Sequence, residues 1–379
     1  MAREQDAVLN NFAKIKVIGM GGGGNNAVNQ MVRLGVKGID FVAVNTDLQA
    51  LNTADAPIKL QIGAKVTKGL GSGANPEVGR KACEESREDL TELVKGVDMV
   101  FITAGMGGGS GTGGAPVLAE ICRQAGVLTV AVVTKPFSFE GARRRTLADQ
   151  GIRELKQHVD TLIVIPNDRV LQIADDNTSF LDAFRLVDDV LRQGVQGISD
   201  LIVLPGLINV DFADVRTIME NAGSALMGIG YGSDDNRAVD AAKAAISSPL
   251  LETSIHGAKG VLFNIVGGPD MGMKEINNAA QIIADAADPD ANIIFGAVID
   301  ENMKGKIKIT VIAAGFDEMA ERVSAPKEFS KISHGPLQAV DEEELEVPAF
   351  LRKNKPLKTP VSSELPAPSA DQRDMFKKN

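Results

Sequence analysis

The chain has 379 residues, a formal net charge of -10 and an aromatic content of only 4%. The acidic balance argues against nucleic-acid binding, which requires a basic surface, and the few cysteines and histidines suit neither a disulfide framework nor a protein-held metal site. The polar N-terminus and the lack of any apolar run near ~18 residues argue against a signal peptide and a membrane span. We therefore expect a cytoplasmic protein of about two or three domains that neither binds nucleic acid nor inserts into a membrane.

Short apolar strands alternate with helices over residues 13–177, after a polar segment at 1–12 that we expect to be flexible. This alternation is typical of a Rossmann-like α/β domain with a parallel sheet. We expect strands at 14–18, 41–44, 58–60, 99–104, 128–133 and 161–165, and helices at 27–34, 77–94, 115–125 and 141–158. Because open sheets of this kind bind ligands where their strands end, the segments that follow the strands form the candidate site.

Two glycine-rich segments follow strands of this domain. The first fits the dinucleotide fingerprint G-x-G-x-x-G from Gly19 to Gly24, with Asp47 as a loosely placed acid, so an NAD-type oxidoreductase stays open. The second, at 105–114, joins a strand to a helix, where backbone N–H groups and the helix N-terminus can bind phosphate. A flexible turn is the alternative. Two such loops favour a nucleoside triphosphate, although the chain lacks the P-loop motif G-x-x-x-x-G-K-[ST].

A long amphipathic helix over 178–200 is expected to connect this domain to a second one. Phe184 and Asp188 are four residues apart and share a face. The ring could stack on a base, and the carboxylate could accept the N1–H and amino group of guanine. A core phenylalanine beside a solvated aspartate explains the spacing equally well. Residues 201–316 then form a smaller α+β domain, with helices at 212–227, 236–247 and 272–287 and strands at 259–266, 292–299 and 306–313.

Two further pairs of charged residues have both a structural and a functional interpretation. Glu140 and Arg144, four residues apart, could form a surface salt bridge or could contact ribose and phosphate. Asp211 and Asp214 could cap the start of a helix. Together with Asn209 they could instead orient a water or a hydrated cation for attack on a phosphoanhydride. Spacing alone favours the structural interpretation of both pairs.

The composition changes after residue 316, where proline, serine, lysine and glutamate become frequent. Such a segment cannot bury a core. We therefore expect a disordered linker at 317–346 and a disordered tail at 355–379. Between them, the apolar residues at 347–354 predict a short docking peptide, unless they are an accidental cluster.

The segment 107–113, with the sequence G-G-G-S-G-T-G, resembles the tubulin-family motif G-G-G-[ST]-G-[ST]-G. Over residues 13–316 the chain is similar to the FtsZ family, the bacterial tubulin homologues that act as cell-division GTPases. The resemblance implies a GTP-binding domain, a central helix and a C-terminal domain that activates GTP hydrolysis. It also implies head-to-tail protofilaments that form the cytokinetic ring at the mid-cell division site. The segments that carry it, besides 107–113, are 19–26, 45–47, 69–79, 134–137, 166–168 and 209–215.

The resemblance further implies roles for individual residues. Asn209, Asp211 and Asp214 would complete hydrolysis in the next subunit, with Mg²⁺ bridging the phosphates. The peptide from Val347 to Lys353 would dock membrane tethers and division regulators, although a longer tail follows it than the family usually has. The residues implied to contact GTP or GDP are Gly22, Gly23, Gly24, Asn26, Gly109, Ser110, Gly111, Thr112, Glu140, Arg144, Asn167, Phe184 and Asp188.

Overall fold

The computed structural model describes residues 13–173, 178–203, 206, 208, 210–251 and 253–316. The N-terminal segment, Asn209 and the linker, docking peptide and tail predicted after residue 316 lie outside these described residues. Among the helices that are described, none combines the length and apolarity needed to cross a membrane.

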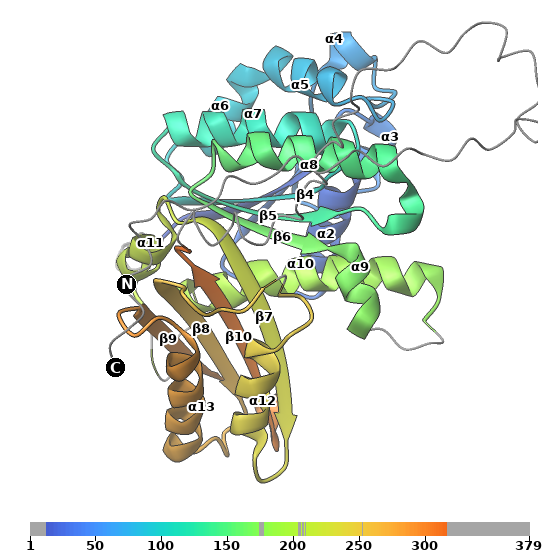
Figure 1. The fold of residues 1–379 in the computed structure, drawn as a ribbon. Coiled ribbons are helices and arrows are strands. Elements are labelled where there is room, and N and C mark those ends of the chain that lie inside the picture. The colour runs from blue at the N-terminus through green and yellow to red at the C-terminus, as the bar shows by residue number, and fades with distance from the viewer. Residues whose placement is uncertain are drawn as a thin grey trace, which may run out of the picture. The chain divides into compact units, whose positions relative to one another are not determined.

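The first domain is a parallel sheet with helices on both faces (Figure 1). Its strands pair in the order β3 (Ile58–Gln61), β2 (Asp40–Asn45), β1 (Ile15–Met20), β4 (Met99–Gly105), β5 (Leu128–Lys135) and β6 (Thr161–Pro166). One face is covered by α2 (Gly21–Arg33) and α10 (Phe180–Val203), and the other by α5 (Pro76–Glu85), α6 (Arg87–Val94), α7 (Ser110–Gln124) and α8 (Ala142–Lys156). The connections contain α3 (Leu48–Asn52), α4 (Ala64–Thr67), α9 (Asn167–Val170) and the 3₁₀ turns η1 (Ser138–Glu140) and η2 (Leu171–Ile173).

The strands of this sheet are apolar along most of their length because helices exclude water from both faces. Successive side chains of a strand point to opposite faces. On β1, Val17 therefore packs into the apolar cluster with α2 and α10, whereas Ile18 packs into the cluster with α7 and α8. Both clusters are rich in aliphatic side chains, as the low aromatic content requires.

The second domain extends the same sheet with four more strands. β7 (Gly223–Ser233) runs parallel to β6 over the pairs Thr161–Gly223, Leu162–Ser224 and Ile163–Ala225. β10 (Lys306–Ala314) pairs antiparallel with β7 and β8 (Gly260–Gly267), and β9 (Asn292–Ile299) pairs parallel with β8. The remaining elements are α11 (Phe212–Met219), α12 (Arg237–Ile246), α13 (Met273–Ala286) and the turn η3 (Glu301–Met303). A parallel-sheet domain, a long helix and a smaller mixed α+β domain confirm the predicted fold class.

The helix predicted over 212–227 is wrong in its second half. α11 ends at Met219, and the chain then turns through Asn221 and Gly223, whose φ angles are 52° and 70°. This left-handed backbone suits asparagine and glycine and does not continue a helix. The residues from Gly223 onward form β7 instead, because β6 and β10 accept them as a pairing strand. The long helix α10 also extends beyond its predicted end, to Val203.

Both glycine-rich segments contribute the first turns of helices. α2 begins at Gly21 and α7 at Ser110, upstream of the predicted starts at 27 and 115. The φ angles of Gly21 and Gly107, 71° and 96°, allow the sharp turn from strand to helix. The helix predicted over 77–94 is divided at Ser86 into α5 and α6.

Candidate functional site

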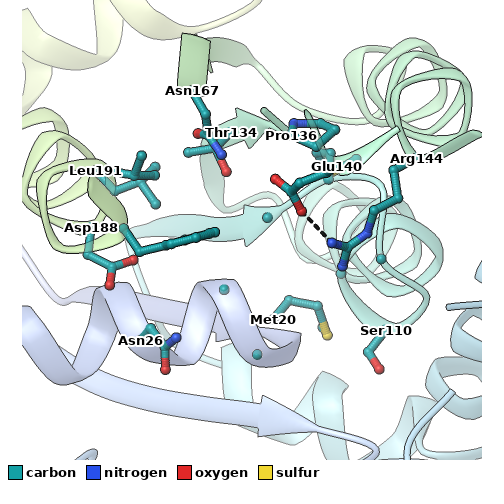
Figure 2. A pocket seen from close by; sticks show the side chains of 18 of the residues that line it. Met20, Asn26, Ser110, Thr134, Pro136, Glu140, Arg144, Asn167, Asp188 and Leu191 are labelled. Atoms are coloured by element: carbon teal, nitrogen blue, oxygen red, sulfur yellow. Dashed lines mark hydrogen bonds and ion pairs between the residues drawn. The ribbon is translucent and has the colours of Figure 1, made fainter. Parts of the chain in front are cut away.

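A cavity of about 440 Å³ opens where β1, β4, β5 and β6 end. This volume lies within the range of small-molecule sites. Figure 2 shows Asp188 and Leu191 projecting from α10 on one side of the cavity, with Arg144 and Ser110 on the other. The residues implied to contact nucleotide that line the cavity are Gly22, Gly23, Asn26, Gly109, Ser110, Gly111, Glu140, Arg144, Asn167, Phe184 and Asp188.

Two of the residues implied to contact nucleotide, Gly24 and Thr112, do not line the cavity and lie behind its wall. A Cβ atom on Gly24 would lie 2.2 Å from the carbonyl oxygen of Thr103, so glycine is needed there for α2 to pack on β4. The Thr112 hydroxyl accepts a hydrogen bond from the Gly107 N–H at 2.8 Å. In this geometry both residues shape the wall, and neither lines the cavity.

Gly22 and Gly108 differ from the other glycines of the wall. A Cβ atom on Gly111 would lie 2.9 Å from the carbonyl oxygen of Gly105, so packing within the protein requires glycine at that position. A Cβ atom on Gly22 or Gly108 would meet no protein atom within 4 Å. These two positions leave space beside the N-termini of α2 and α7, where backbone N–H groups and the helix dipoles favour an anion. The wall therefore fits a phosphate chain.

Three hydroxyl groups meet at the start of α7. Ser110 Oγ lies 2.7 Å from Thr46 Oγ1 and 3.0 Å from Ser72 Oγ. Ser72 also lines the cavity, although it was not among the residues implied by the resemblance. Its location in the glycine-rich segment at 69–79 was the available signal. Hydroxyls at this place can donate to an anion held at the helix N-terminus.

The rim of the cavity carries an ion pair between Glu140 and Arg144, drawn as a dashed line in Figure 2. The salt bridge that spacing favoured therefore forms, and both side chains also line the cavity. Glu140 accepts a hydrogen bond from the Phe137 N–H at 2.9 Å, which fixes its carboxylate. The Arg144 side chain is 48% exposed, so its guanidinium can exchange this carboxylate for an anion in the cavity.

Asp168 connects this rim to the segment that follows β6. Its carboxylate accepts hydrogen bonds from the Ser138 N–H at 2.8 Å and the Ser138 hydroxyl at 2.5 Å, and Arg145 lies 3.4 Å away. Because Asn167 precedes Asp168 and Glu140 lies close to Ser138 along the chain, these bonds fix two walls of the cavity relative to each other. No spacing rule identifies such a contact, so Asp168 was not predicted to be a site residue.

Asn167, Phe184 and Asp188 lie on the part of the cavity wall that α9 and α10 form. Asn167 is 5% exposed, and its Oδ1 atom has no hydrogen-bond partner. Burial raises the pKa of Asp188 to about 7. The Phe184 ring packs edge-on against Phe137, with centroids 5.2 Å apart. A buried carbonyl and a desolvated carboxylate suit a ligand edge that offers N–H donors, and the ring can stack on a planar base.

Asp211 and Asp214 belong to α11, which lies at the end of the sheet where β6 begins, away from the cavity. Both are exposed, and Asp211 caps α11 by accepting a hydrogen bond from the Ala213 N–H at 2.8 Å. Met219, the last residue of α11, accepts a hydrogen bond from Thr161 at the start of β6. Figure 1 shows α11 at this end of β6 and α9 at the other end, and Asn167, the first residue of α9, lines the cavity. β6 has six residues and so spans roughly 20 Å. Neither acid lines the cavity of its own chain.

Comparisons with known proteins place this geometry in a family. Residues 14–175 match the Tubulin/FtsZ family GTPase domain, and residues 223–317 match the FtsZ family C-terminal domain. The chain is similar to the structure titled "FtsZ dimer, empty" from M. jannaschii, with 44% identity and a TM-score of 0.79 over 83% of this chain and 91% of that one.

Two more distant structures come from Haloferax volcanii. CetZ2, titled as a GTPgS bound protofilament, has 22% identity and a TM-score of 0.67 over 82% of this chain and 96% of that one. CetZ1, titled as a GDP bound monomer, has 22% identity and a TM-score of 0.69 over 80% and 95%. These two support the fold alone. The two family matches and the 44% identity show that the chain belongs to the FtsZ family and contains its GTPase domain.

Proposed function

We propose that this protein binds GTP in the cavity, assembles head to tail with further copies of itself, and hydrolyses GTP at each junction while building a cytokinetic ring. The observation that carries the proposal is the separation of Asp211 and Asp214 from the cavity by the length of β6. Acids that cannot reach their own cavity can act only on the cavity of another copy. A contact of this kind joins two different surfaces, so it generates open filaments.

The cavity fits GTP from its phosphates to its base. Backbone N–H groups at the N-termini of α2 and α7 would hold the phosphates, and Arg144 would exchange Glu140 for a phosphate oxygen. Glu140 would then be available to accept a ribose hydroxyl. At the base, Phe184 would stack on the ring. The Asp188 carboxylate would accept two donors from guanine, whereas adenine presents an acceptor at N1.

Mg²⁺ would be held mainly by phosphate oxygens and water. Among the residues that line the cavity, the carboxylates are Glu140 and Asp188, which we assign to the ribose and the base. Mg²⁺ tolerates few protein ligands when phosphates supply the others. When bound, it would neutralise charge that develops on the phosphates. The protein's part is to direct N–H and hydroxyl donors at the same oxygens.

Hydrolysis would be completed by the exposed carboxylates of the neighbouring copy. Asp211 and Asp214, with Asn209, would orient the attacking water in line with the terminal phosphorus, so little covalent chemistry is needed from the protein. Asp211 caps the start of α11 and is exposed to solvent, so a neighbouring copy can reach it. Turnover would then depend on assembly.

The cellular setting belongs to the same proposal. We place the protein in the cytoplasm, at the mid-cell ring, with membrane tethers and division regulators docked on the peptide from Val347 to Lys353. The sequence led us to expect a role in bacterial division, but the relative at 44% identity comes from M. jannaschii, which is an archaeon. We therefore propose a role in the division of a prokaryotic cell, and more specifically of a bacterial cell.

The first test measures phosphate release from GTP across a range of protein concentrations, with sedimentation to quantify polymer. We expect turnover per subunit to rise with concentration and to level off once assembly is complete. A rate per subunit that stays constant on dilution would contradict completion of the site by a second copy.

The second test compares Asp211→Asn with Asp285→Asn, a matched control on the exposed surface of α13. Asparagine keeps the acceptor that caps α11 and removes the charge. Asp211→Asn is expected to bind GTP and to assemble, yet to release phosphate roughly 100-fold more slowly, whereas Asp285→Asn behaves as wild type. Loss of GTP binding by Asp211→Asn would place that residue in its own cavity and refute the role in trans.

A further inference from the structure

Strand β6 contacts two functional parts of the molecule at its two ends. Its carboxyl end leads into Asn167, which lines the nucleotide cavity. Its amino end holds the segment between α11 and β7. α11 carries Asp211 and Asp214, so the second contact bears on the acids proposed to act on a neighbouring copy.

The contacts at the amino end come from Asp160 and Thr161. The Thr161 hydroxyl is fully buried and donates a hydrogen bond to the carbonyl oxygen of Met219 at 2.5 Å. The Asp160 carbonyl accepts the Gly223 N–H at 2.9 Å. The Asp160 carboxylate accepts the Thr129 N–H of β5 at 2.8 Å and the Asn221 N–H at 3.4 Å. Two strands of the GTPase domain are thereby tied to the residues that leave α11.

These bonds fix the direction of α11 at its C-terminal end. The last carbonyls of a helix have no partner within the helix, and Thr161 supplies one for Met219. Asn221, which follows in a left-handed conformation, is held by Asp160. α11 is only eight residues long, so a change of angle at one end moves the other end directly.

We propose that Asp160 and Thr161 are positioning residues for GTP hydrolysis, which set the angle of α11 and so aim Asp211 and Asp214 at the cavity of the neighbouring copy. The inference rests on the proposed function and adds to it the residues that orient the two acids. The acids belong to one subunit's exposed surface, but their aim is set by β5 and β6 of that subunit's own GTPase domain. Neither Asp160 nor Thr161 touches the nucleotide cavity.

Asp98 provides a matched control within the same sheet. It precedes β4 as Asp160 precedes β6, and its carboxylate accepts the Lys14 N–H at 2.8 Å. Its backbone N–H bonds to the Lys14 carbonyl oxygen at 2.9 Å. Asp98 therefore secures neighbouring strands in the same way, but none of these bonds reaches α11. Replacing Asp98 removes a similar contact from the sheet edge without releasing the helix that carries the acids.

The experiment uses the full chain and compares Thr161→Val, Asp160→Ala and Asp98→Ala with wild type. Valine keeps the branched shape of the buried threonine and places a methyl group where the hydroxyl was, so the hydrogen bond to Met219 is lost. For each protein we would measure the GTP dissociation constant below the assembly concentration, the critical concentration by sedimentation, and phosphate release per polymerised subunit. We expect Thr161→Val and Asp160→Ala to bind GTP and to assemble within about two-fold of wild type, and to release phosphate roughly ten-fold more slowly. Asp98→Ala should retain wild-type turnover.

Three outcomes would overturn the inference. Unchanged turnover per polymerised subunit in Thr161→Val would show that the bond to Met219 does not aim the acids. An equally large loss of phosphate release in Asp98→Ala would show that the effect comes from general destabilisation of the sheet and not from the orientation of α11. Weaker GTP binding by Thr161→Val would show that Thr161 acts on the nucleotide cavity and not on α11. Should Asp160→Ala fail to fold, the near-isosteric Thr161→Val still decides. If wild-type turnover itself proves independent of concentration, the proposed function fails, and this result is distinct from the others.

Discussion

The affinity for guanine nucleotides should depend on the ionisation of Asp188. Burial raises the pKa of this carboxyl from 3.8 to about 7, so near neutral pH about half of the empty protein carries a proton there. Only the carboxylate can accept both the N1–H and the amino group of guanine. Binding should therefore require loss of this proton, and acidic pH should weaken binding.

The size of the effect follows from the ionised fraction. With a pKa of about 7, about 91% of the carboxyl is ionised at pH 8 and about 3% at pH 5.5. The apparent dissociation constant is the intrinsic one divided by the competent fraction. We thus expect GDP to bind about 30-fold more weakly at pH 5.5 than at pH 8, and to release close to one proton per nucleotide bound at the lower pH.

The assay is calorimetric titration of GDP at several pH values, in buffers that differ in ionisation enthalpy. The terminal phosphate of the nucleotide titrates in the same range, so Asp188→Asn is the matched control, in which only the phosphate changes. Asp188→Asn should bind more weakly at pH 8, since its amide places a donor against a donor, and should show a much flatter pH profile. Identical profiles in wild type and Asp188→Asn would refute the assignment of Asp188 to guanine.

Four further predictions concern stability and the cavity walls. Gly22→Ala should fold with unchanged or higher stability, since its Cβ meets no protein atom and alanine favours a helix by ~1 kcal/mol, yet bind GTP at least about ten-fold more weakly. Gly24→Ala should lose about 2 kcal/mol or more, because its Cβ would lie 2.2 Å from the Thr103 carbonyl oxygen. Thermal unfolding measures the stability of the two variants, and equilibrium dialysis measures their GTP affinity. Equal changes in both variants would contradict the assignment of Gly22 to ligand space and of Gly24 to packing. Asp168→Ala should weaken GTP binding about five-fold through the walls that it joins, measured by dialysis against wild type, and unchanged binding would contradict that role. Finally, because burial raises the pKa of Asp188 in the folded state, the nucleotide-free protein should lose stability as pH rises from 4 to 7, by about 3 kcal/mol relative to Asp188→Asn. Urea unfolding at both pH values measures this, and a constant difference would count against it.

The sequence was most informative where local pattern and long-range structure agree. Continuous apolar runs such as 99–104 and 128–133 predict buried parallel strands, and β4 and β5 occupy them. The residues after Met219 were misassigned, because apolar residues at 225–229 suit a helix or a strand at that length. What makes them a strand is pairing with β6 and β10, which lie far away in sequence.

The candidate site shows the same limit at the level of single residues. The motifs indicate which glycines lie near phosphate, but only packing separates Gly22, which leaves open space, from Gly24, which touches the Thr103 carbonyl. Spacing likewise could not decide whether Glu140 pairs with Arg144 or lines the cavity, and it does both. Asp168 has no spacing signal at all, since its partner Ser138 is thirty residues away.

The short pairing of β6 with β7 has a mechanical consequence. In a head-to-tail filament, tension would enter each subunit near the cavity and leave through α11, and so would run along β6 rather than across it. Hydrogen bonds of a parallel ladder lie across the strands, and under such a pull they must shear together instead of opening one after another. Among the described residues, the β6–β7 ladder that joins the two halves of the sheet has three pairs, from Thr161–Gly223 to Ile163–Ala225. This overlap is therefore one of the contacts that must yield before the two domains can slide apart.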